Sequence, residues 1–179
     1  MYHAKQEGRN NVQLFSRDMS ERTERRVDLL GRLRGAIARG ELQLHYQPQV
    51  DVRSGSIIGV EALLRWNDRE RGQVPPMQFI PLAEDTGLIV DIGEWVLREA
   101  CRQAKIWLDA GLGPLTVAVN LSPRQFRQKN LVSMVAAILA ETALPPELLE
   151  LEITESTVMH RTEEAATSLR ALHELGVQI

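Results

Sequence analysis

One stretch decides the fold: Ile57-Ile58-Gly59-Val60-Glu61-Ala62-Leu63-Leu64-Arg65-Trp66. Side chains alternate between the two faces of an extended strand, so the even-numbered residues form an apolar face that predicts a covering helix. The odd-numbered residues place Glu61 and Arg65 together on the other face. Charges on an otherwise apolar strand need a partner, which favours an ion or a phosphate at this face. A simple Glu61–Arg65 ion pair on an edge strand is the alternative that this stretch alone leaves open.

The composition is that of an ordinary globular protein. The 179 residues suffice for one domain with a sizeable core, and 44% of them are hydrophobic and 25% charged. The net charge of −3 gives no general attraction to nucleic acid or to an anionic membrane. The single cysteine, Cys101, excludes a disulfide framework and a cysteine-based zinc site, and its apolar neighbours predict a buried thiol. Without a membrane-spanning run or a leader peptide we expect a cytoplasmic location, with an upstream membrane anchor on a longer parent left open.

The first forty or so residues differ in character from the rest. Residues 1–15 hold one helix-forming run and one short strand, too little for a core, and we interpret them as the tail of another domain. Residues 16–39 are rich in charge and carry an apolar stripe, which predicts a connector helix that docks by its C-terminal half and ends at Gly40. The arginines between Arg22 and Arg34 alternate with acids, so we interpret them as a solvated face rather than a nucleic-acid stripe.

From residue 41 onward, strands alternate with helices. The patterns predict strands at 42–49, 56–66, 115–121 and 148–154, helices near 77–86, 91–110, 128–142 and 162–175, and the start of another strand at 177–179. We expect an Asp91–Glu94 capping box to open the helix at 91–110, and a polar loop before Pro75-Pro76. The alternation favours a parallel sheet, either open or closed into a barrel. No glycine-rich phosphate loop follows a strand, which weakens the case for a nucleotide-binding open sheet.

Three polar residues are expected on one face of this sheet, near the ends of neighbouring strands: Glu61, Asn120 and Glu152. Adjacent strands lie about 4.8 Å apart, so three side-chain oxygens can converge on one ion. Two carboxylates and an amide suit Mg²⁺ or Mn²⁺ better than zinc. Taken singly, Asn120 is also typical of a cap or turn before Ser122-Pro123, and Glu152 of an outward carboxylate. The four histidines compete poorly for a metal role: His3, His45, His160 and His173.

Five ordered motifs resemble those of the EAL-domain cyclic di-GMP phosphodiesterases. They are Tyr46-Gln47-Pro48, Glu61-Ala62-Leu63-Leu64-Arg65-Trp66, Phe79-Ile80-Pro81-Leu82-Ala83-Glu84, Asn120-Leu121-Ser122 and Glu152-Ile153-Thr154-Glu155-Ser156. The similarity runs from about residue 28 to the end. Met1-Tyr2-His3-Ala4-Lys5 with Gly8-Arg9-Asn10 is similar to the end of a GGDEF (diguanylate cyclase) domain. The resemblance therefore implies a GGDEF remnant at 1–15, a helical connector at 16–30 and the N-terminal portion of an EAL domain at 31–179.

The fold that the resemblance implies is α/β, an incomplete TIM-like (β/α)8 barrel. It would be roughly the first half of the barrel, with the first strand antiparallel and the site at the C-terminal mouth. The implied metal ligands are Glu61, Asn120 and Glu152. The implied catalytic residues are Glu61 and Glu155, the latter helping to hold the loop after its strand. The implied substrate contacts come from Gln47, Leu63, Arg65 and Ser122.

The activity that the resemblance implies is hydrolysis of cyclic di-GMP to the linear dinucleotide with two Mg²⁺ or Mn²⁺ ions, in the complete parent. The family's Asp-Asp pair after the strand at 177–179, its lysine and its general-base glutamate are absent from this chain. We therefore expect the chain alone to be inactive, with an open strand edge and uncovered apolar surface. The implied partners are cyclic di-GMP and an upstream GGDEF domain, without a nucleic acid polymer and with a homodimer left open. The alternative is a non-catalytic cyclic di-GMP receptor or protein-docking module.

Overall fold

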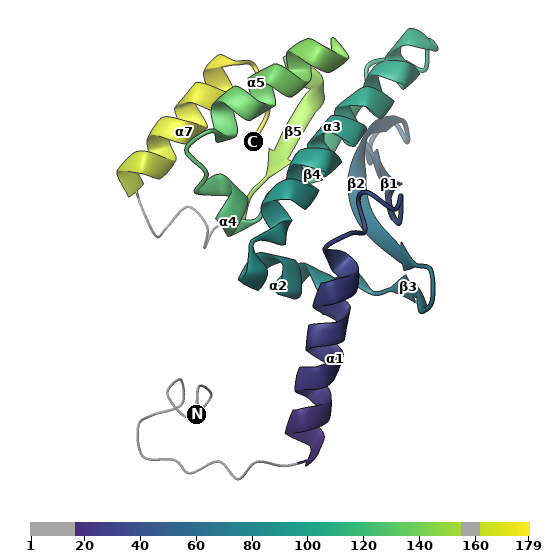
Figure 1. Cartoon of the computed structure of the whole chain (residues 1–179). Helices are drawn as coiled ribbons and strands as arrows, with labels where there is room; N and C mark the ends of the chain where they lie inside the picture. The colour runs from purple at the N-terminus through teal and green to yellow at the C-terminus, as the bar shows by residue number, and fades with distance from the viewer. Residues whose placement is uncertain (1–16, 155–161) are drawn as a thin grey trace.

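The computed structural model describes residues 17–154 and 162–179, with side chains for 23–154 and 165–179 (Figure 1). The strands are β1 (Leu42–Val50), β2 (Ile57–Asp68), β3 (Gly72–Val74), β4 (Thr116–Asn120) and β5 (Leu149–Glu152). The helices are α1 (Arg17–Leu33), α2 (Pro76–Thr86), α3 (Leu88–Asp109), α4 (Pro123–Phe126), α5 (Leu131–Thr142), the 3-10 turn η2 (Pro146–Leu148) and α7 (Thr162–Glu174). The predicted alternation of strands and helices is confirmed. The interpretation of residues 1–15 as a domain remnant lies outside the described residues.

The sheet has the strand order β1-β2-β4-β5, with β3 paired to β2. β1 runs antiparallel to β2, whereas the β2–β4 and β4–β5 pairs are parallel. A parallel bridge between Glu150 and Gln178 brings the segment after α7 alongside β5. This is the predicted α/β sheet of an incomplete TIM-like barrel with its first strand antiparallel. In the part of the chain that is described, β1 pairs only with β2, and Val50, Ile57 and Ile179 are about half exposed, as expected of an open half-barrel.

The even-numbered face of β2 is buried from Val60 onward, with Leu64 partly buried, whereas Ile58 at the start of the strand is exposed. Val60, Ala62 and Trp66 are almost fully enclosed, and the Trp66 ring meets Phe79 of α2 edge-on at a centroid distance of 5.5 Å. Burying a large apolar side chain contributes about 1.5–3 kcal/mol, and an edge-to-face aromatic pair adds about 0.5–1.5 kcal/mol. This packing fixes the strand and leaves Glu61 and Arg65, both half-buried, on its opposite face.

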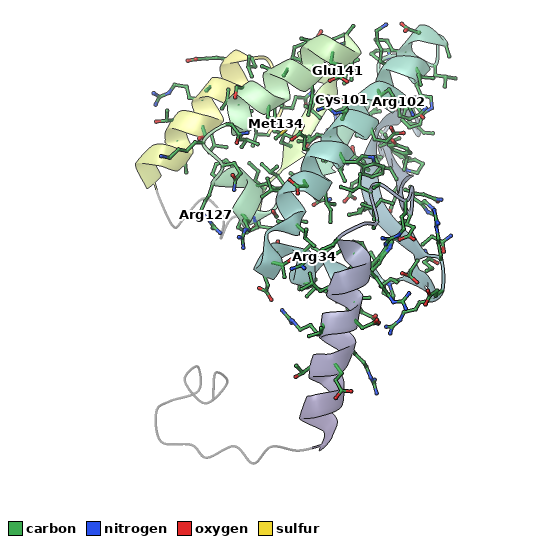
Figure 2. All side chains as sticks on the ribbon, viewed as in Figure 1. Arg34, Cys101, Arg102, Arg127, Met134 and Glu141 are labelled. Atoms are coloured by element: carbon green, nitrogen blue, oxygen red, sulfur yellow. The ribbon has the colours of Figure 1, made fainter. Side chains whose placement is uncertain are left out.

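Helix α3 covers the sheet with the predicted apolar stripe and lies beside α5 (Figure 1). Trp107 of this stripe is half-buried and meets Tyr46 of β1 edge-on at 4.8 Å. Cys101 lies on the same helix (Figure 2), fully enclosed, and burial raises the pKa of its thiol to about 12, so the prediction of an unreactive packing residue is confirmed. The fully buried members of the stripe are Ile92, Val96, Ala100 and Ala104.

The predicted start of α3 at Asp91 is wrong, because Gly87 serves two helices at once. Gly87 takes a left-handed conformation, φ 89°, and its N–H closes α2 by reaching the carbonyls of Ala83 and Glu84. The chain turns within that single residue, and α3 begins at Leu88 with no side-chain cap. The expected Asp91–Glu94 capping box is therefore not formed, and Asp91 lies in the first turn, where its negative charge suits the helix dipole.

Differences from expectation are also found in α1, in the loop before Pro75 and at the start of α5. The connector helix α1 docks by its C-terminal half, with Leu29 and Leu33 buried, but it ends at Leu33 and continues as turns to Gly40. The expected loop before Pro75 contains the short strand β3, which pairs with the end of β2. The helix expected at 128–142 begins at Leu131, preceded by the separate one-turn helix α4. None of the described helices combines the length and the apolar character needed to cross a bilayer.

Candidate metal centre

Glu61, Asn120 and Glu152 lie together on one face of three neighbouring parallel strands. Asn120 is the register partner of Glu152, and Glu61 pairs with Ala118, two residues before Asn120. The Asn120 Nδ2 donates a hydrogen bond of 2.7 Å to the Glu61 Oε1. This bond leaves the Asn120 Oδ1 free to act as a ligand next to two carboxylates. The three predicted residues are thus brought together. Asn120 and Glu152 are the last residues of β4 and β5, whereas Glu61 lies within β2, near the end of its parallel pairing with β4.

The electrostatics of this cluster are those of crowded negative charge. Burial raises the pKa of Glu152 above its ordinary value, and the charges of Glu61 and Glu150 raise it further. Within the described residues, no arginine or lysine pairs with Glu61 or Glu152, although many other acids of the chain have such partners. A nearby cation would relieve this repulsion. The two carboxylates and the amide oxygen are hard donors, so they fit Mg²⁺ or Mn²⁺.

These donors make up only part of a metal site. Across residues 17–154 and 162–179, no three His, Cys, Asp or Glu side chains gather in a way that could hold a metal ion. The third donor of the cluster is the amide of Asn120. Glu155, predicted to be catalytic, lies outside the described residues. His3 and His160 also lie outside them, whereas His45 and His173 are exposed on β1 and α7.

The predicted substrate contacts continue the same face along β1 and β2. The antiparallel register pairs Gln47 with Glu61 and His45 with Leu63. Arg65 follows at the next inward position of β2, and its Nη1 donates to the Leu64 carbonyl at 3.0 Å. Arg65 makes no ion pair within the described part of the chain. A guanidinium without an acidic partner, on the same strand face as Glu61, suits a bound anion such as a phosphate.

Ser122 caps the N-terminus of helix α4, a role for which the sequence had also offered Asn120. The Ser122 Oγ accepts a hydrogen bond from the Gln125 backbone N–H at 3.3 Å, and the Gln125 Oε1 accepts from the Ser122 N–H and Oγ at 3.1 and 2.8 Å. This capping box opens α4. Asn120 is therefore not the helix cap, and its amide is free for the cluster. Substrate contact by Ser122 stays a prediction, since its hydroxyl is engaged with Gln125.

The sequence reasoning missed a second polar cluster, at the far end of β2. Arg32 of α1 was interpreted as part of a solvated face, yet it pairs with Asp68, whose side chain is only 2% exposed. The buried Glu41 likewise pairs with Arg39. The sequence signal for this cluster was the occurrence of arginines close to acidic residues both before β1 and after β2. The contact itself joins residues 36 positions apart, which local patterns do not reveal.

The fold and the site define a class: a barrel-type α/β domain with oxygen donors on three neighbouring parallel strands. Comparison with known proteins gives the family. The family model described as "EAL domain" matches residues 30–179. The chain belongs to the EAL domain family.

Two curated relatives align with this chain over its full length. The bifunctional diguanylate cyclase/cyclic di-GMP phosphodiesterase MucR of Pseudomonas aeruginosa is 49% identical over 179 residues, which cover 26% of its length. The cyclic di-GMP phosphodiesterase PdeR of Escherichia coli is 36% identical over 179 residues, which cover 27% of its length. The chain thus spans about a quarter of the length of these curated relatives.

Solved structures share the fold. The PaMucR phosphodiesterase in complex with c-di-GMP superposes with a TM-score of 0.81 at 51% identity, covering 84% of this chain and 61% of that chain. The EAL domain of Xanthomonas citri FimX in complex with c-diGMP superposes with a TM-score of 0.74 at 28% identity, covering 90% of this chain and 61% of that chain. Both structures are of EAL proteins with a bound cyclic dinucleotide.

Proposed function

We propose that the complete protein hydrolyses cyclic di-GMP to linear di-GMP at the face that carries Glu61, Asn120 and Glu152. The observation that carries the proposal is the contact of Asn120 with Glu61 beside a carboxylate whose pKa is raised. The identity to MucR and PdeR, both named as cyclic di-GMP phosphodiesterases, supports the choice of substrate. The donor set supports Mg²⁺ or Mn²⁺ as the cofactor, two ions in the complete site.

Each residue of the face has a role in this proposal. Glu61, Asn120 and Glu152 would hold the divalent ions, which when bound activate water and neutralise charge on the phosphate. Arg65 binds a phosphate oxygen pair with its planar fork, which also orients the scissile bond. The Gln47 amide and the Leu63 side chain hold the dinucleotide along the strand face. Glu155 supports the loop after β5, and Ser122 contributes a substrate contact.

We further propose the domain organisation of the parent. Residues 1–15 would be the C-terminal end of a GGDEF domain, and residues 31–179 would be the N-terminal portion of the EAL domain. Residues 16–30 would form the helical connector between them. The name of MucR, which joins cyclase and phosphodiesterase activities in one protein, supports the presence of both domains in the parent. Because only two carboxylates and one amide gather at the described site, this chain alone would not turn over substrate. A homodimer of the parent is compatible with this organisation.

The experiment that tests the function is product analysis with the complete protein. Cyclic di-GMP incubated with the protein and Mg²⁺ should give linear di-GMP by chromatography, and EDTA should stop the reaction. Cleavage of a single-stranded RNA polymer serves as the specificity control and should not occur. A complete protein that binds cyclic di-GMP by calorimetry but yields no linear product would support the alternative, a receptor or docking module. The presence of all three predicted ligand positions in this chain favours the enzyme.

A further inference from the structure

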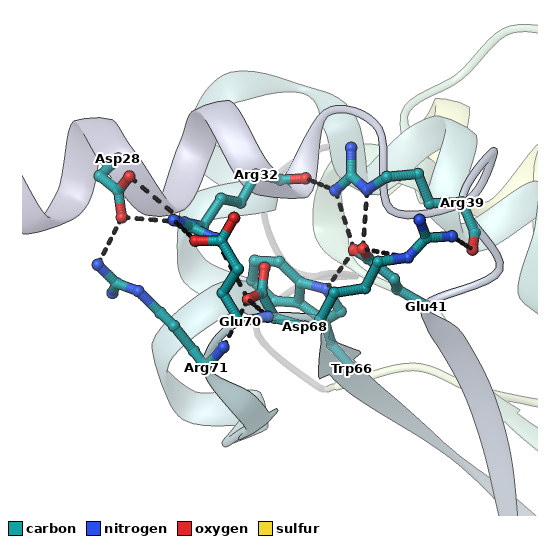
Figure 3. A network of polar contacts seen from close by, with 9 residues as sticks. Asp28, Arg32, Arg39, Glu41, Trp66, Asp68, Glu70 and Arg71 are labelled. Carbon is teal, nitrogen blue, oxygen red and sulfur yellow. Dashed lines mark hydrogen bonds and ion pairs between the residues drawn. The ribbon is translucent and has the colours of Figure 1, made fainter.

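A network of ion pairs joins α1 to the end of β2, on the strand that carries Arg65 (Figure 3). We call it the α1 clamp and define it as Arg32, Arg39, Glu41 and Asp68, with the Trp66 indole. Glu41 and Asp68 are 4% and 3% exposed, which is rare for charged residues and requires partners. The proposed reaction uses neither of them, so the clamp needs an explanation of its own.

Asp68 forms the first half of the clamp, at the turn between β2 and β3. Its Oδ1 accepts the backbone N–H groups of Glu70 and Arg71 at 2.9 and 2.8 Å. The Arg32 Nη1 donates to the same oxygen at 3.4 Å, and the Arg32 Nη2 donates to the Glu70 Oε2 at 2.6 Å. A single guanidinium on α1 therefore holds both the last residue of β2 and the middle of the turn that follows it.

Glu41 forms the second half, just before β1. It receives two hydrogen bonds from Arg39, Nε at 2.8 Å and Nη2 at 2.9 Å, and one from the Trp66 Nε1 at 3.3 Å. Its backbone carbonyl accepts the Asn67 N–H at 2.9 Å. Arg39 also donates to the Arg32 carbonyl near the end of α1. The last turn of α1 is thus linked through Glu41 to Trp66, as well as directly to Asp68.

Arg65 stands next to these anchored positions. Trp66 and Asp68 lie on the buried face of β2, so the strand alternation directs Arg65 to the opposite face, with Glu61. The only hydrogen bond of the Arg65 guanidinium among the described residues goes to the adjacent Leu64 carbonyl. No neighbouring element therefore holds the Arg65 side chain, and the backbone that the clamp fixes decides where its guanidinium can reach.

We propose that Arg32 is a positioning residue: from α1 it fixes the end of β2 on which Arg65 stands, so that the seating of α1 sets the affinity of the site for an anionic dinucleotide. This inference rests on the proposed function for its ligand. Most of α1 precedes the EAL domain, and Arg32 lies in its last turns, where the domain begins. A change in the seating of α1 therefore reaches the phosphate-binding position without any contact between α1 and the nucleotide.

The test compares two arginines of the same helix in the complete protein. R32Q removes the ion pair to the buried Asp68, whereas R26Q removes an exposed ion pair to Asp85 of α2 and serves as the control. We expect R32Q to raise the KM for cyclic di-GMP roughly three- to tenfold, with kcat within about twofold of wild type. R32K, which keeps the charge without the fork, should fall between R32Q and wild type. R26Q should match wild type.

Hydrogen–deuterium exchange of the same proteins without nucleotide tests the positioning directly. In R32Q the amides of residues 61–68 should exchange at least about twofold faster, whereas those of 116–121 should not change. Unchanged exchange at 61–68 together with a wild-type KM overturns the inference, as does an equal effect of R26Q. If R32Q does not fold, R32K decides by the same two readouts.

The proposed function can fail separately from this inference. A wild-type protein that neither binds nor cleaves cyclic di-GMP removes the proposed function. In that case the exchange rates of 61–68 in R32Q and R26Q decide whether Arg32 positions the strand. Faster exchange in R32Q alone supports the positioning role, and equal rates refute it.

Discussion

The α1 clamp and the candidate metal centre, two acidic clusters that β2 joins, shift the pKa values of their carboxyl groups in opposite directions. At the α1 clamp, the hydrogen bonds from Arg39 lower the pKa of Glu41 despite its burial. Burial by itself would raise the pKa of Asp68, but backbone hydrogen bonds and the Arg32 charge bring it below its usual value. At the candidate metal centre, burial and the Glu61 charge raise the pKa of Glu152.

The difference separates a structural cluster from a binding cluster. The clamp carries its own cations, so its acids stabilise the fold without help. The candidate centre gathers acids with no basic partner among the described residues, which leaves them ready for an added cation. Acidic residues of the same strand, Glu61 and Asp68, therefore serve two purposes, and the local balance of charge distinguishes them. The following experiments would break or sharpen this distinction.

The largest expected effect is that of Glu61→Gln in the complete protein. It should reduce turnover of cyclic di-GMP by at least about a hundredfold, because a metal ion contributes several kcal/mol to the stabilisation of transition-state charge. Glutamine keeps the shape, can still accept the hydrogen bond from Asn120 and removes a charge that repels Glu152, so the melting temperature should not fall. A steady-state assay measures the loss of turnover, and a thermal melt measures the melting temperature. Normal turnover would remove Glu61 from the metal centre.

Arg65→Ala should weaken the binding of cyclic di-GMP by about 1.5–3 kcal/mol, the range for a hydrogen bond to a charged group. Titration calorimetry measures the change. Arg53→Ala, in the exposed turn between β1 and β2, is the matched control and should bind as wild type does. A loss smaller than about 0.5 kcal/mol, less than a threefold change in Kd, would place Arg65 outside the pocket.

Asp68→Ala should lower the free energy of unfolding by about 1–3 kcal/mol, because it leaves the Glu70 and Arg71 N–H groups without their acceptor. Asp68→Asn keeps an acceptor oxygen and should cost less. Chemical denaturation of both variants gives the comparison. Equal stability of Asp68→Ala and wild type would show that the clamp does not stabilise the fold.

Glu152→Gln should have the smallest effect, and of opposite sign. Because the folded-state pKa of Glu152 is raised, the folded protein binds more protons than the unfolded chain, and stability falls as pH rises from the ordinary glutamate pKa through the raised value. The variant lacks this pH-dependent loss of stability. Without metal, its free energy of unfolding should therefore exceed that of wild type by less than about 1 kcal/mol at pH 7, with no gain at pH 4. Melting curves across this pH range check it. A variant that is less stable at pH 7 would contradict the crowded-carboxylate account.

The strand parity of the sequence predicted most of the candidate site. Alternation placed Glu61 opposite the apolar face of its strand, and the same rule placed Asn120 and Glu152 on the matching face of the next two strands. Parallel pairing then brought all three close together, as the register of Asn120 with Glu152 and the hydrogen bond from Asn120 to Glu61 show. These positions depend on the two-residue period of a strand, which short segments of sequence record well.

The clamp and two of the helix boundaries depend on features that local patterns do not contain. The Arg32–Asp68 contact depends on how the β2–β3 turn meets α1, far apart in the chain. The early start of α3 depends on the left-handed turn at Gly87, a property of one backbone angle. Ser122 was expected to touch substrate, and its capping of α4 became visible only once the partner Gln125 was placed. Tertiary contacts decided these features, and hydrophobic periodicity could not.

The most direct test of the central claim is anomalous diffraction from crystals of the complete protein soaked with Mn²⁺ and cyclic di-GMP. The account predicts a manganese peak at about 2.0–2.4 Å from carboxylate oxygens of Glu61 and Glu152 and from the Asn120 Oδ1. A manganese peak elsewhere, with these three side chains uncoordinated, would contradict it.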